Sequence, residues 1–169
     1  FGATGGVMEA ALRTVYEIVT GREVPFKNLD IMPVRGMEWI REAVIKFEKV
    51  KPEYKFLEGA EVKIAVAHGT ANAKKIVDEI LAGRGFWHFI EIMACPGGCL
   101  GGGGQPIPTN LEIREARARA IYSEDEALAL RKSHENPEIL QIYKEYFGEP
   151  NSHKAHKLLH THYTPRGRY

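Results

Sequence analysis

The sequence predicts an α/β fold in which a parallel sheet is flanked by helices and followed by an all-helical C-terminal tail. Between residues 62 and 93, an apolar run, a helical pattern and a second apolar run are typical of a strand–helix–strand unit. After Pro108, glycine becomes scarce and helix-forming residues dominate. We therefore expect a sheet-bearing lobe over residues 1–108 and a helical segment over residues 109–169.

The composition is that of an ordinary globular protein. Hydrophobic residues make up 44% and charged residues 27% of the chain, and the net charge is +1. This charge argues neither for nor against nucleic acid, and no nucleic-acid partner is expected. The apolar runs are too short for a membrane span. Two cysteines make no secreted disulfide framework, and no signal peptide is visible at the start. We expect a cytoplasmic protein.

The first part of the chain is expected to combine one helix with short strands. Residues 6–20 repeat apolar side chains at helical spacing, with Thr4 as the expected N-cap and Gly21 as the residue that ends the helix. Short strands are predicted over residues 29–34 and 43–47.

The clearest strand covers residues 62–67, and a helix over residues 71–82 leads to a second strand at residues 87–93. We expect the two strands to be parallel neighbours, because the helix between them provides a crossover. Ligands of open parallel sheets lie beyond the carboxyl ends of the strands. His68 ends the first strand at that edge, and a hydrogen-bonding scaffold role is preferred for it over metal ligation.

The tail is predicted to be helical throughout. A basic helix that faces solvent is expected over residues 111–121, and a second helix with Ser123 as its cap over residues 123–132. A third begins at Pro137, and a last one covers about residues 152–160. The four histidines near the end of the tail have the spacing of ligands on a helix face, but packing is the preferred interpretation: His153, His156, His160 and His162.

Residues 89–106 hold both cysteines of the chain, Cys95 and Cys99, directly after the second strand. Glycines surround the thiols, at positions 97, 98, 101, 102, 103 and 104. Thiolates bind soft metals and iron–sulfur clusters, and glycine lets backbone N–H groups approach a bulky anionic cluster. A cubane takes four thiolates, so two cysteines leave its ligand set incomplete.

Spacing alone leaves other interpretations of this loop open. A disulfide across three residues would be strained, and it is disfavoured in a cytosolic protein. Structural zinc needs a second pair of cysteine ligands, which the sequence does not contain. Zinc binding, redox-active thiols, and inert thiols in a tight glycine turn remain as alternatives to a cluster.

The string EIMACPGGCLGGGGQP resembles the third cluster-binding motif of the iron-only ([FeFe]) hydrogenases. The opening string FGATGGVMEAALRT resembles the segment of these enzymes that follows a loop near the catalytic cluster. Residues 120–163 resemble their small subunit, which is a separate polypeptide in some members and is fused here. The chain is therefore identified as a member of this family, matching the C-terminal part of the catalytic domain with a small-subunit-like tail.

The resemblance implies an H-cluster, in which a [4Fe–4S] cluster is linked to a catalytic di-iron unit. Cys95 would ligate the cubane, Cys99 would ligate it and bridge to the di-iron unit, and Met93 would approach the dithiolate of that unit. The remaining implied cofactor contacts lie at the start of the chain and in the glycine loop: Phe1, Gly2, Ala3, Thr4, Gly97, Gly98, Gly102, Gly103, Gly104 and Gln105.

The implied activity is reversible H2 oxidation and proton reduction. In the family, the other two cluster cysteines and the proton path belong to upstream motifs, so this chain is expected to be a fragment that is inactive and holds no complete cluster alone. Its expected partners are the missing N-terminal half of the domain, H2 and protons, and an electron carrier such as ferredoxin or a NAD(P)-linked subunit. The alternatives are a non-catalytic hydrogenase-like iron–sulfur protein, for cluster delivery or sensing, and an interaction subunit that completes its site with a partner chain.

Overall fold

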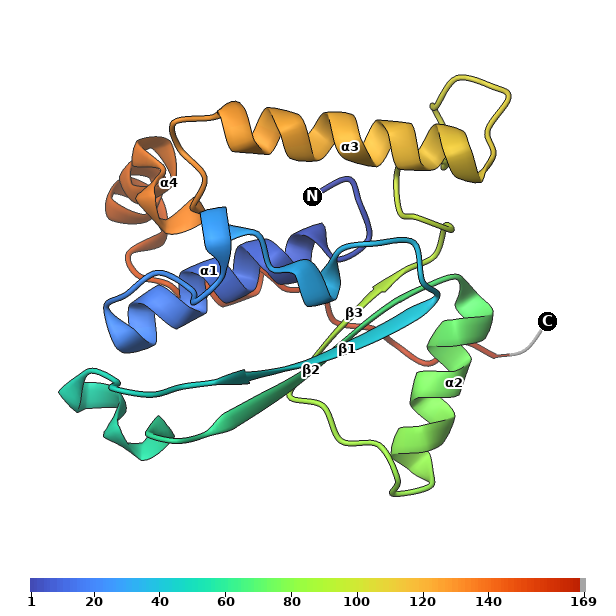
Figure 1. Cartoon of the computed structure of the whole chain (residues 1–169). Coiled ribbons are helices and arrows are strands. Elements are labelled where there is room, and N and C mark those ends of the chain that lie inside the picture. Colours follow the sequence, from blue (N-terminus) through green and yellow to red (C-terminus); the bar gives the residue numbers. More distant parts are fainter. Residues whose placement is uncertain (168–169) are drawn as a thin grey trace. The chain divides into compact units, whose positions relative to one another are not determined.

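The computed structural model describes residues 1–167, and the chain divides into two compact units, Phe1–Arg131 and Lys132–Tyr169. The first unit contains a three-stranded sheet with helices, and the described part of the second is helical (Figure 1). Unit one consists of α1 (Gly6–Thr20), β1 (Ile40–Lys46), β2 (Glu61–His68), α2 (Thr70–Leu81), β3 (Phe89–Met93) and α3 (Leu111–Ala127). This confirms the predicted α/β class and the helical character of the tail.

The sheet is mixed rather than parallel throughout. Its order is β1-β2-β3, and β2 runs parallel to β3 as predicted, with His68 opposite Met93. β1 runs antiparallel to β2, with Ile40 opposite Ala67. The prediction of a parallel sheet is therefore wrong for β1. The link from β1 to β2 contains only the short 3-10 turn Pro52–Leu57, so the chain turns back instead of crossing over.

The strand predicted over residues 29–34 is also wrong. This segment forms two 3-10 turns, Lys27–Leu29 and Met32–Val34. Positive φ angles at Asn28 (57°) and Leu29 (59°) turn the backbone, and a proline within the segment lacks the N–H that a strand ladder needs. Two of its apolar residues, Ile31 and Val34, are instead fully buried in the core cluster that includes α1.

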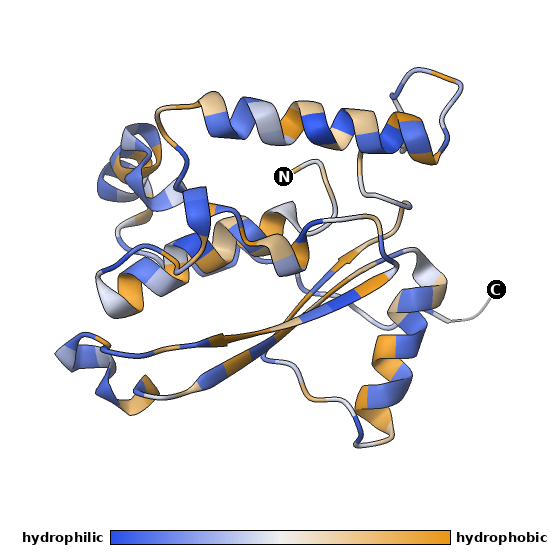
Figure 2. Ribbon diagram, in the orientation of Figure 1, coloured by the Kyte–Doolittle hydropathy of each residue, from blue (hydrophilic) through white to orange (hydrophobic). Residues whose placement is uncertain are grey.

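The central strand β2 packs on both faces. On one face, Ile64 and Val66 join a core cluster with the apolar side of α1, and on the other face Ala65 and Ala67 join Ile76 of α2. Successive strand residues point to opposite faces, which explains why residues 64–67 are all apolar and fully buried. Figure 2 shows the apolar residues of the strands and the apolar stripes of the helices. The core residues that α1 contributes are Met8, Leu12, Tyr16 and Val19.

The start of α1 is capped by a carboxylate from β3. The N-cap is Gly5 rather than the expected Thr4, and it makes no side-chain cap. The Glu91 carboxylate accepts hydrogen bonds from the N–H groups of Gly5 and Met8, each at 2.6 Å. A carboxylate at this end satisfies unpaired N–H groups and complements the helix dipole. The predicted end is confirmed, since Gly21 adopts the left-handed conformation with φ 70°.

An ion cluster joins α1, the loop before β1 and α3 within the first unit. The Glu9 carboxylate lies 2.7 Å from guanidinium nitrogens of both Arg13 and Arg35. Asp125 of α3 lies 3.0 Å from Arg13 and 2.6 Å from Arg131. Burial of Asp125 raises the pKa of its carboxyl, but hydrogen bonds from Arg13 and Arg131 outweigh it and lower this pKa to about 2. The ion cluster is defined as Glu9, Arg13, Asp30, Arg35, Asp125 and Arg131.

Helix α3 replaces the two helices predicted over residues 111–132. Asn110 is its N-cap, and the Asn110 side chain accepts a hydrogen bond from the N–H of Ile113 at 2.9 Å. Ser123 lies inside the helix, so the prediction of a cap there is wrong. Neither glycine nor proline interrupts residues 111–127, and the cap signal of one serine is too weak to end a helix.

The second unit contains α4 (Pro137–Ile142), the π-helical turn Tyr143–Phe147 and α5 (His153–Leu159). The predicted start at Pro137, the predicted stop at Gly148 and the last short helix are confirmed. The rings of His156 and His160 stack at 4.3 Å, but within residues 1–167 no three of the tail histidines bring ligand atoms together. No helix among the described residues is long and apolar enough to cross a bilayer.

Replacing Glu91 by alanine should destabilise the fold, because it leaves two N–H groups at the start of α1 without an acceptor. We expect the free energy of unfolding to fall by about 1–3 kcal/mol, measured by urea unfolding. Glu124→Ala, at an exposed position of α3, is the control and should stay within about 0.5 kcal/mol of the parent. Equal midpoints for the two variants would rule out a stabilising cap.

Replacing Asp125 by asparagine should remove stability in a pH-dependent way. The pKa of Asp125 is lower in the folded chain than its ordinary 3.8, so its ion pairs stabilise the fold above that pH and cease to do so as pH falls toward about 2. The difference in unfolding free energy between parent and Asp125→Asn should be about 2 kcal/mol at neutral pH and shrink on acidification. Urea unfolding across this pH range measures it, and Asp78→Asn on α2 is the control. A difference that stays constant down to pH 2 would contradict the assignment.

Candidate metal centre

The cysteine loop begins where β3 ends, at the edge where β2 also ends (Figure 1). The N–H of Gly69 donates to the carbonyl of Met93 at 2.8 Å, which ties the two strand ends together. His68 is 2% exposed, and its Nδ1 accepts a hydrogen bond from the N–H of Gly97 at 3.1 Å. Burial lowers the pKa of His68, and the charges of Arg41 and Arg114 lower it further. The imidazole is therefore neutral at neutral pH, which is the form that accepts this bond.

The first residues of the chain pair with the cysteine loop, although about ninety positions separate them in the sequence. Ala3 and Gly98 form an antiparallel bridge. Two backbone hydrogen bonds flank this bridge, from Thr4 N–H to the Gly97 carbonyl at 3.1 Å and from Cys99 N–H to the Gly2 carbonyl at 2.8 Å. The two segments that the sequence singled out separately therefore form one site.

Glycine is required at the centre of this site. A Cβ at Gly98 would lie 2.6 Å from Sδ of Met93 and 2.7 Å from the Gly2 carbonyl oxygen, and the φ angle there is 83°. Gly97 also has a positive φ of 79°. A Cβ at Gly102 would lie 3.4 Å from Sγ of Cys95, so its absence keeps the space beside this thiol open. This arrangement is a cradle of bare backbone next to a thiol.

Both thiols are free and both cysteines are exposed, so the structure does not contain the disulfide that spacing left open. Exposed thiols beside backbone without side chains suit a bulky group that approaches from outside the chain. The residues present therefore fit one side of a metal–sulfur cluster site. They would provide two of the four thiolate ligands that a cubane takes.

The remaining candidate residues make fewer contacts with the rest of the chain than Gly97 and Gly98 do. Phe1 is 73% exposed, and its backbone lies against Gly6. No atom of the described residues lies within 4 Å of a Cβ placed at Gly103 or Gly104. The N–H of Gln105 donates to the carbonyl of Gly102 at 3.2 Å. The structure thus brings the chain start to the thiols and leaves residues 103–105 as an open outer turn.

Two arginines of α3 contact the cysteine loop, and neither was among the residues expected at the site. Arg117 donates to the carbonyls of Leu100 and Pro106, and the stem of Arg114 lies over Gly97. The expectation that this helix faces solvent is therefore wrong for one of its faces. Arg114 and Arg117 are three residues apart and therefore share a helix face, but the sequence does not indicate that this face meets the backbone of the loop.

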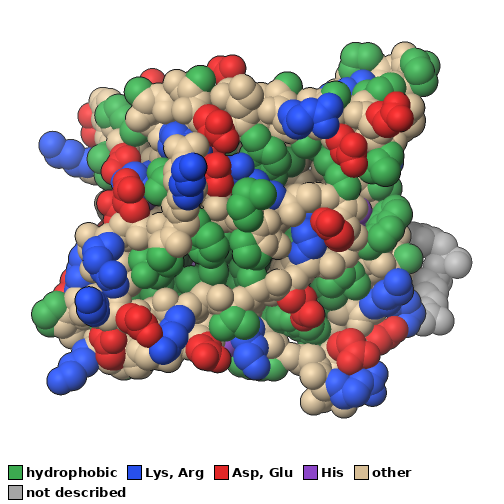
Figure 3. All heavy atoms as spheres, viewed as in Figure 1, with side chains coloured by type: hydrophobic (Ala, Val, Ile, Leu, Met, Phe, Trp, Pro, Cys, Tyr) green, Lys and Arg blue, Asp and Glu red, His purple; other side chains and the backbone are tan. Residues whose placement is uncertain are grey.

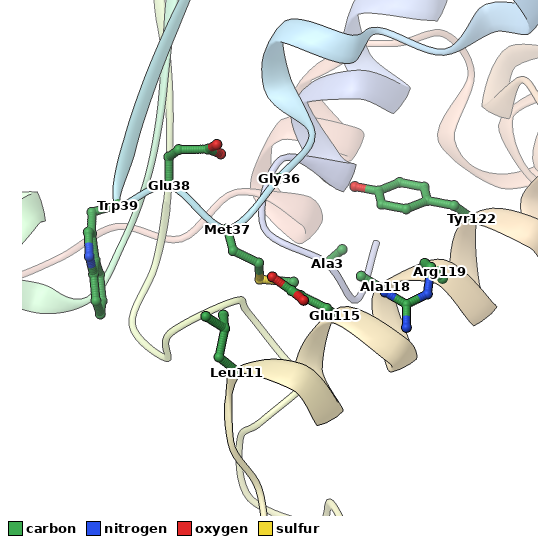
Figure 4. A pocket seen from close by; sticks show the side chains of 10 residues that line it. All are labelled: Ala3, Gly36, Met37, Glu38, Trp39, Leu111, Glu115, Ala118, Arg119 and Tyr122. Carbon is green, nitrogen blue, oxygen red and sulfur yellow. The ribbon is translucent and has the colours of Figure 1, made fainter.

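A groove of about 560 Å³ lies between α3 and the loop before β1 (Figure 4). Ala3 and Met37 lie on one side of it, and Glu115 and Arg119 extend from α3 on the other. Met37 connects the groove to the cradle, because its Sδ lies 3.3 Å from where a Cβ of Gly97 would be. The groove is lined by Ala3, Gly36, Met37, Glu38, Trp39, Leu111, Glu115, Ala118, Arg119 and Tyr122.

Two family models match the chain. Residues 1–103 match the family described as iron only hydrogenase large subunit, C-terminal domain, and residues 111–166 match iron hydrogenase small subunit. The chain is 46% identical over 169 residues to the NADP-reducing hydrogenase subunit HndD of Solidesulfovibrio fructosivorans, an alignment that covers 99% of this chain and 27% of that protein. It is 30% identical over 165 residues to cytosolic iron-sulfur assembly component 3 of Rattus norvegicus, covering 96% of this chain and 31% of the relative.

The fold is also similar to solved structures. A variant of the [FeFe]-hydrogenase HydA1 from Chlamydomonas reinhardtii superposes with a TM-score of 0.77 at 45% identity, covering 96% of this chain and 45% of that chain. The chain thus spans less than half the length of these relatives. Since the family match covers most of the chain and the identity extends over its whole length, the chain belongs to the iron-only ([FeFe]) hydrogenases, as the C-terminal domain of the large subunit followed by a small-subunit-like region.

Proposed function

We propose that this chain provides the side of an H-cluster site that carries Cys95 and Cys99, in a hydrogenase that interconverts H2 with protons and electrons. The observation that supports this most directly is the pair of free, exposed thiols beside the glycine cradle, at the end of β3. The chain contains two cysteines, whereas a cubane takes four thiolates. The other ligands therefore come from another segment of polypeptide.

In this proposal each residue has its own role. Cys95 would ligate the [4Fe–4S] cluster, and Cys99 would ligate it and lie next to the di-iron unit. Met93 packs its sulfur against Gly98, so it would orient the loop and present a thioether to the group. When bound, the H-cluster supplies the redox chemistry of H2. The chain holds the loop in place through His68 and the paired chain start, and its glycines leave room for the cluster.

We further propose a functional boundary near residue 108, between a cluster-binding lobe (1–108) and the small-subunit-like segment (109–169). The two family matches support it, since one ends at residue 103 and the other begins at residue 111. The compact first unit nevertheless extends to Arg131. The ion cluster and the contacts of Arg117 account for the difference, because they attach α3 to the cluster-binding lobe.

The partner that supplies the remaining ligands would be the N-terminal half of the catalytic domain. Exposed apolar residues support a covering partner, and among them Phe1 is 73% and Trp39 is 56% exposed. Figure 3 shows hydrophobic side chains exposed among charged ones on one face. The electron carrier would be ferredoxin or a NAD(P)-linked subunit, and the likeness to an NADP-reducing hydrogenase subunit favours the second.

A second candidate is a non-catalytic relative that handles iron–sulfur clusters for other proteins. The 30% identity to cytosolic iron-sulfur assembly component 3 over nearly the whole chain is the observation in its favour. The 46% identity to a hydrogenase subunit favours the catalytic proposal. H2 evolution by the loaded complex separates the two, because a cluster-handling protein would bind iron and sulfide without this activity.

The chain alone should hold no complete cluster. We expect anaerobic reconstitution with iron and sulfide to leave little tightly bound iron, because two thiolates do not complete a cubane. Co-expression with a polypeptide that corresponds to the preceding part of the relatives' catalytic domain should allow a cubane to bind. Iron and acid-labile sulfide assays after gel filtration measure the outcome. About four irons per chain without the partner would show that the site is complete by itself.

Replacing Cys99 by serine should abolish H2 evolution in a complex loaded with both the cubane and the di-iron unit, because an alcohol is a poor ligand for a soft metal. We expect Cys95→Ser to reduce the iron content as well, since both thiolates would bind the cubane. Thr109→Ser, at an exposed position after the loop, is the matched control and should keep the parent's activity. Full H2 evolution by Cys99→Ser would remove Cys99 from the ligand set.

A further inference from the structure

Arg117 of α3 closes the glycine-rich loop that follows Cys99. Its Nη1 donates to the carbonyl of Leu100 at 2.7 Å, and its Nη2 donates to the carbonyl of Pro106 at 2.9 Å. One planar guanidinium therefore joins both ends of residues 101–105 at a fixed separation. Leu100 is 1% exposed and packs with Ala3 and Ala118, so one end of the loop is anchored in the core.

Arg114 lies three positions earlier, on the same face of α3. Its Cδ is 3.3 Å from the place of a Cβ on Gly97 and 2.8 Å from the place of a Cβ on Gly101. The Arg114 stem therefore lies directly on the loop on both sides of Cys99. The positive charge of Arg114 also lowers the pKa of the His68 imidazole, because it disfavours a second positive charge nearby. A permanent positive charge thus lies beside the backbone that carries both thiols.

We propose that Arg114 and Arg117 are positioning residues of the cluster loop, so that the small-subunit-like helix acts directly on the metal centre. Arg117 fixes the course of the loop between Leu100 and Pro106, and Arg114 places a positive charge beside it. The second role rests on the proposed function, because it requires an anionic cluster on Cys95 and Cys99. A positive charge favours the more negative, reduced state of a cluster, and nearby charge sets the reduction potential of such clusters.

Hydrogen exchange on the full chain tests the role of Arg117. In Arg117→Gln, the N–H groups of Gly98, Cys99 and Gln105 should exchange at least about tenfold faster, because a hydrogen bond to a charged donor no longer opposes local opening. Arg117→Lys keeps the charge but not the two-pronged geometry, so it should fall between Arg117→Gln and the parent. Arg119→Gln removes the same charge from an exposed position of the same helix and should leave loop exchange unchanged.

Acceleration confined to the loop supports the proposal. Equal loop exchange in Arg117→Gln and Arg119→Gln would overturn it, and so would acceleration shared equally with the core amides of β2, which reports global unfolding. Arg117→Lys retains the long side chain and its packing, so it is the second test if Arg117→Gln does not fold. Its loop amides should then exchange faster than those of Arg119→Gln, without faster exchange of the β2 core amides.

The reduction potential of the cubane tests the role of Arg114 in the complex with the polypeptide that supplies the remaining ligands. Arg114→Gln should lower the midpoint potential, Arg114→Lys should keep it near the parent value, and Arg119→Gln should not shift it. If the role of Arg114 is purely structural, Arg114→Lys and Arg114→Gln should shift the midpoint potential equally. Equal shifts would therefore contradict the electrostatic role. If the parent complex binds no cluster, the proposed function fails, whereas the exchange measurement still decides whether Arg117 holds the loop.

Discussion

The parallel pairing of β2 with β3 is the constraint on which the site depends. It places His68 opposite Met93, so the buried imidazole that ends one strand can accept a hydrogen bond from the loop that follows the other. The same β3 carries Glu91, whose carboxylate holds the first turn of α1. Because α1 is fixed there, the residues before it are delivered to the cysteine loop and pair with Gly98. One strand pairing thus determines where both halves of the cradle meet.

The attachment of α3 crosses the boundary between the two family matches. The ion cluster and the two arginines on the loop contact the first lobe at opposite ends of this helix, through Asp125 near its end and Arg114 near its start. Ion pairs that are largely buried and hydrogen-bonded have a defined geometry, and removing one partner is costly. Both ends of α3 are therefore fixed against the first lobe. Helix α3, which begins the region that matches the iron hydrogenase small subunit, shares a core cluster with Leu100 of the cysteine loop.

Periodicity and turn residues predicted most of the elements, because α1 buries one regular apolar face and residues 64–67 of β2 form a buried apolar run. The errors occur where tertiary contacts outweigh local pattern. Residues 29–34 are mostly apolar but form turns that bury Ile31 and Val34, and the orientation of β1 depends on how residues 47–60 turn back. The thiols and the glycine loop were evident from spacing and resemblance, whereas Arg117 acts through two backbone carbonyls that no local pattern reveals.

The glycines of the loop are not equivalent, and this has a practical consequence for labelling the site. Gly98 is enclosed by a thioether and by the backbone of the chain start, so any larger residue would displace the pairing. Gly103 faces open space and needs no left-handed backbone. A side chain carrying a small vibrational reporter, such as a nitrile, can therefore be introduced there a few residues from the thiols. The outer turn thus provides an attachment point from which the electric field and hydration beside the metal centre can be followed as a partner docks.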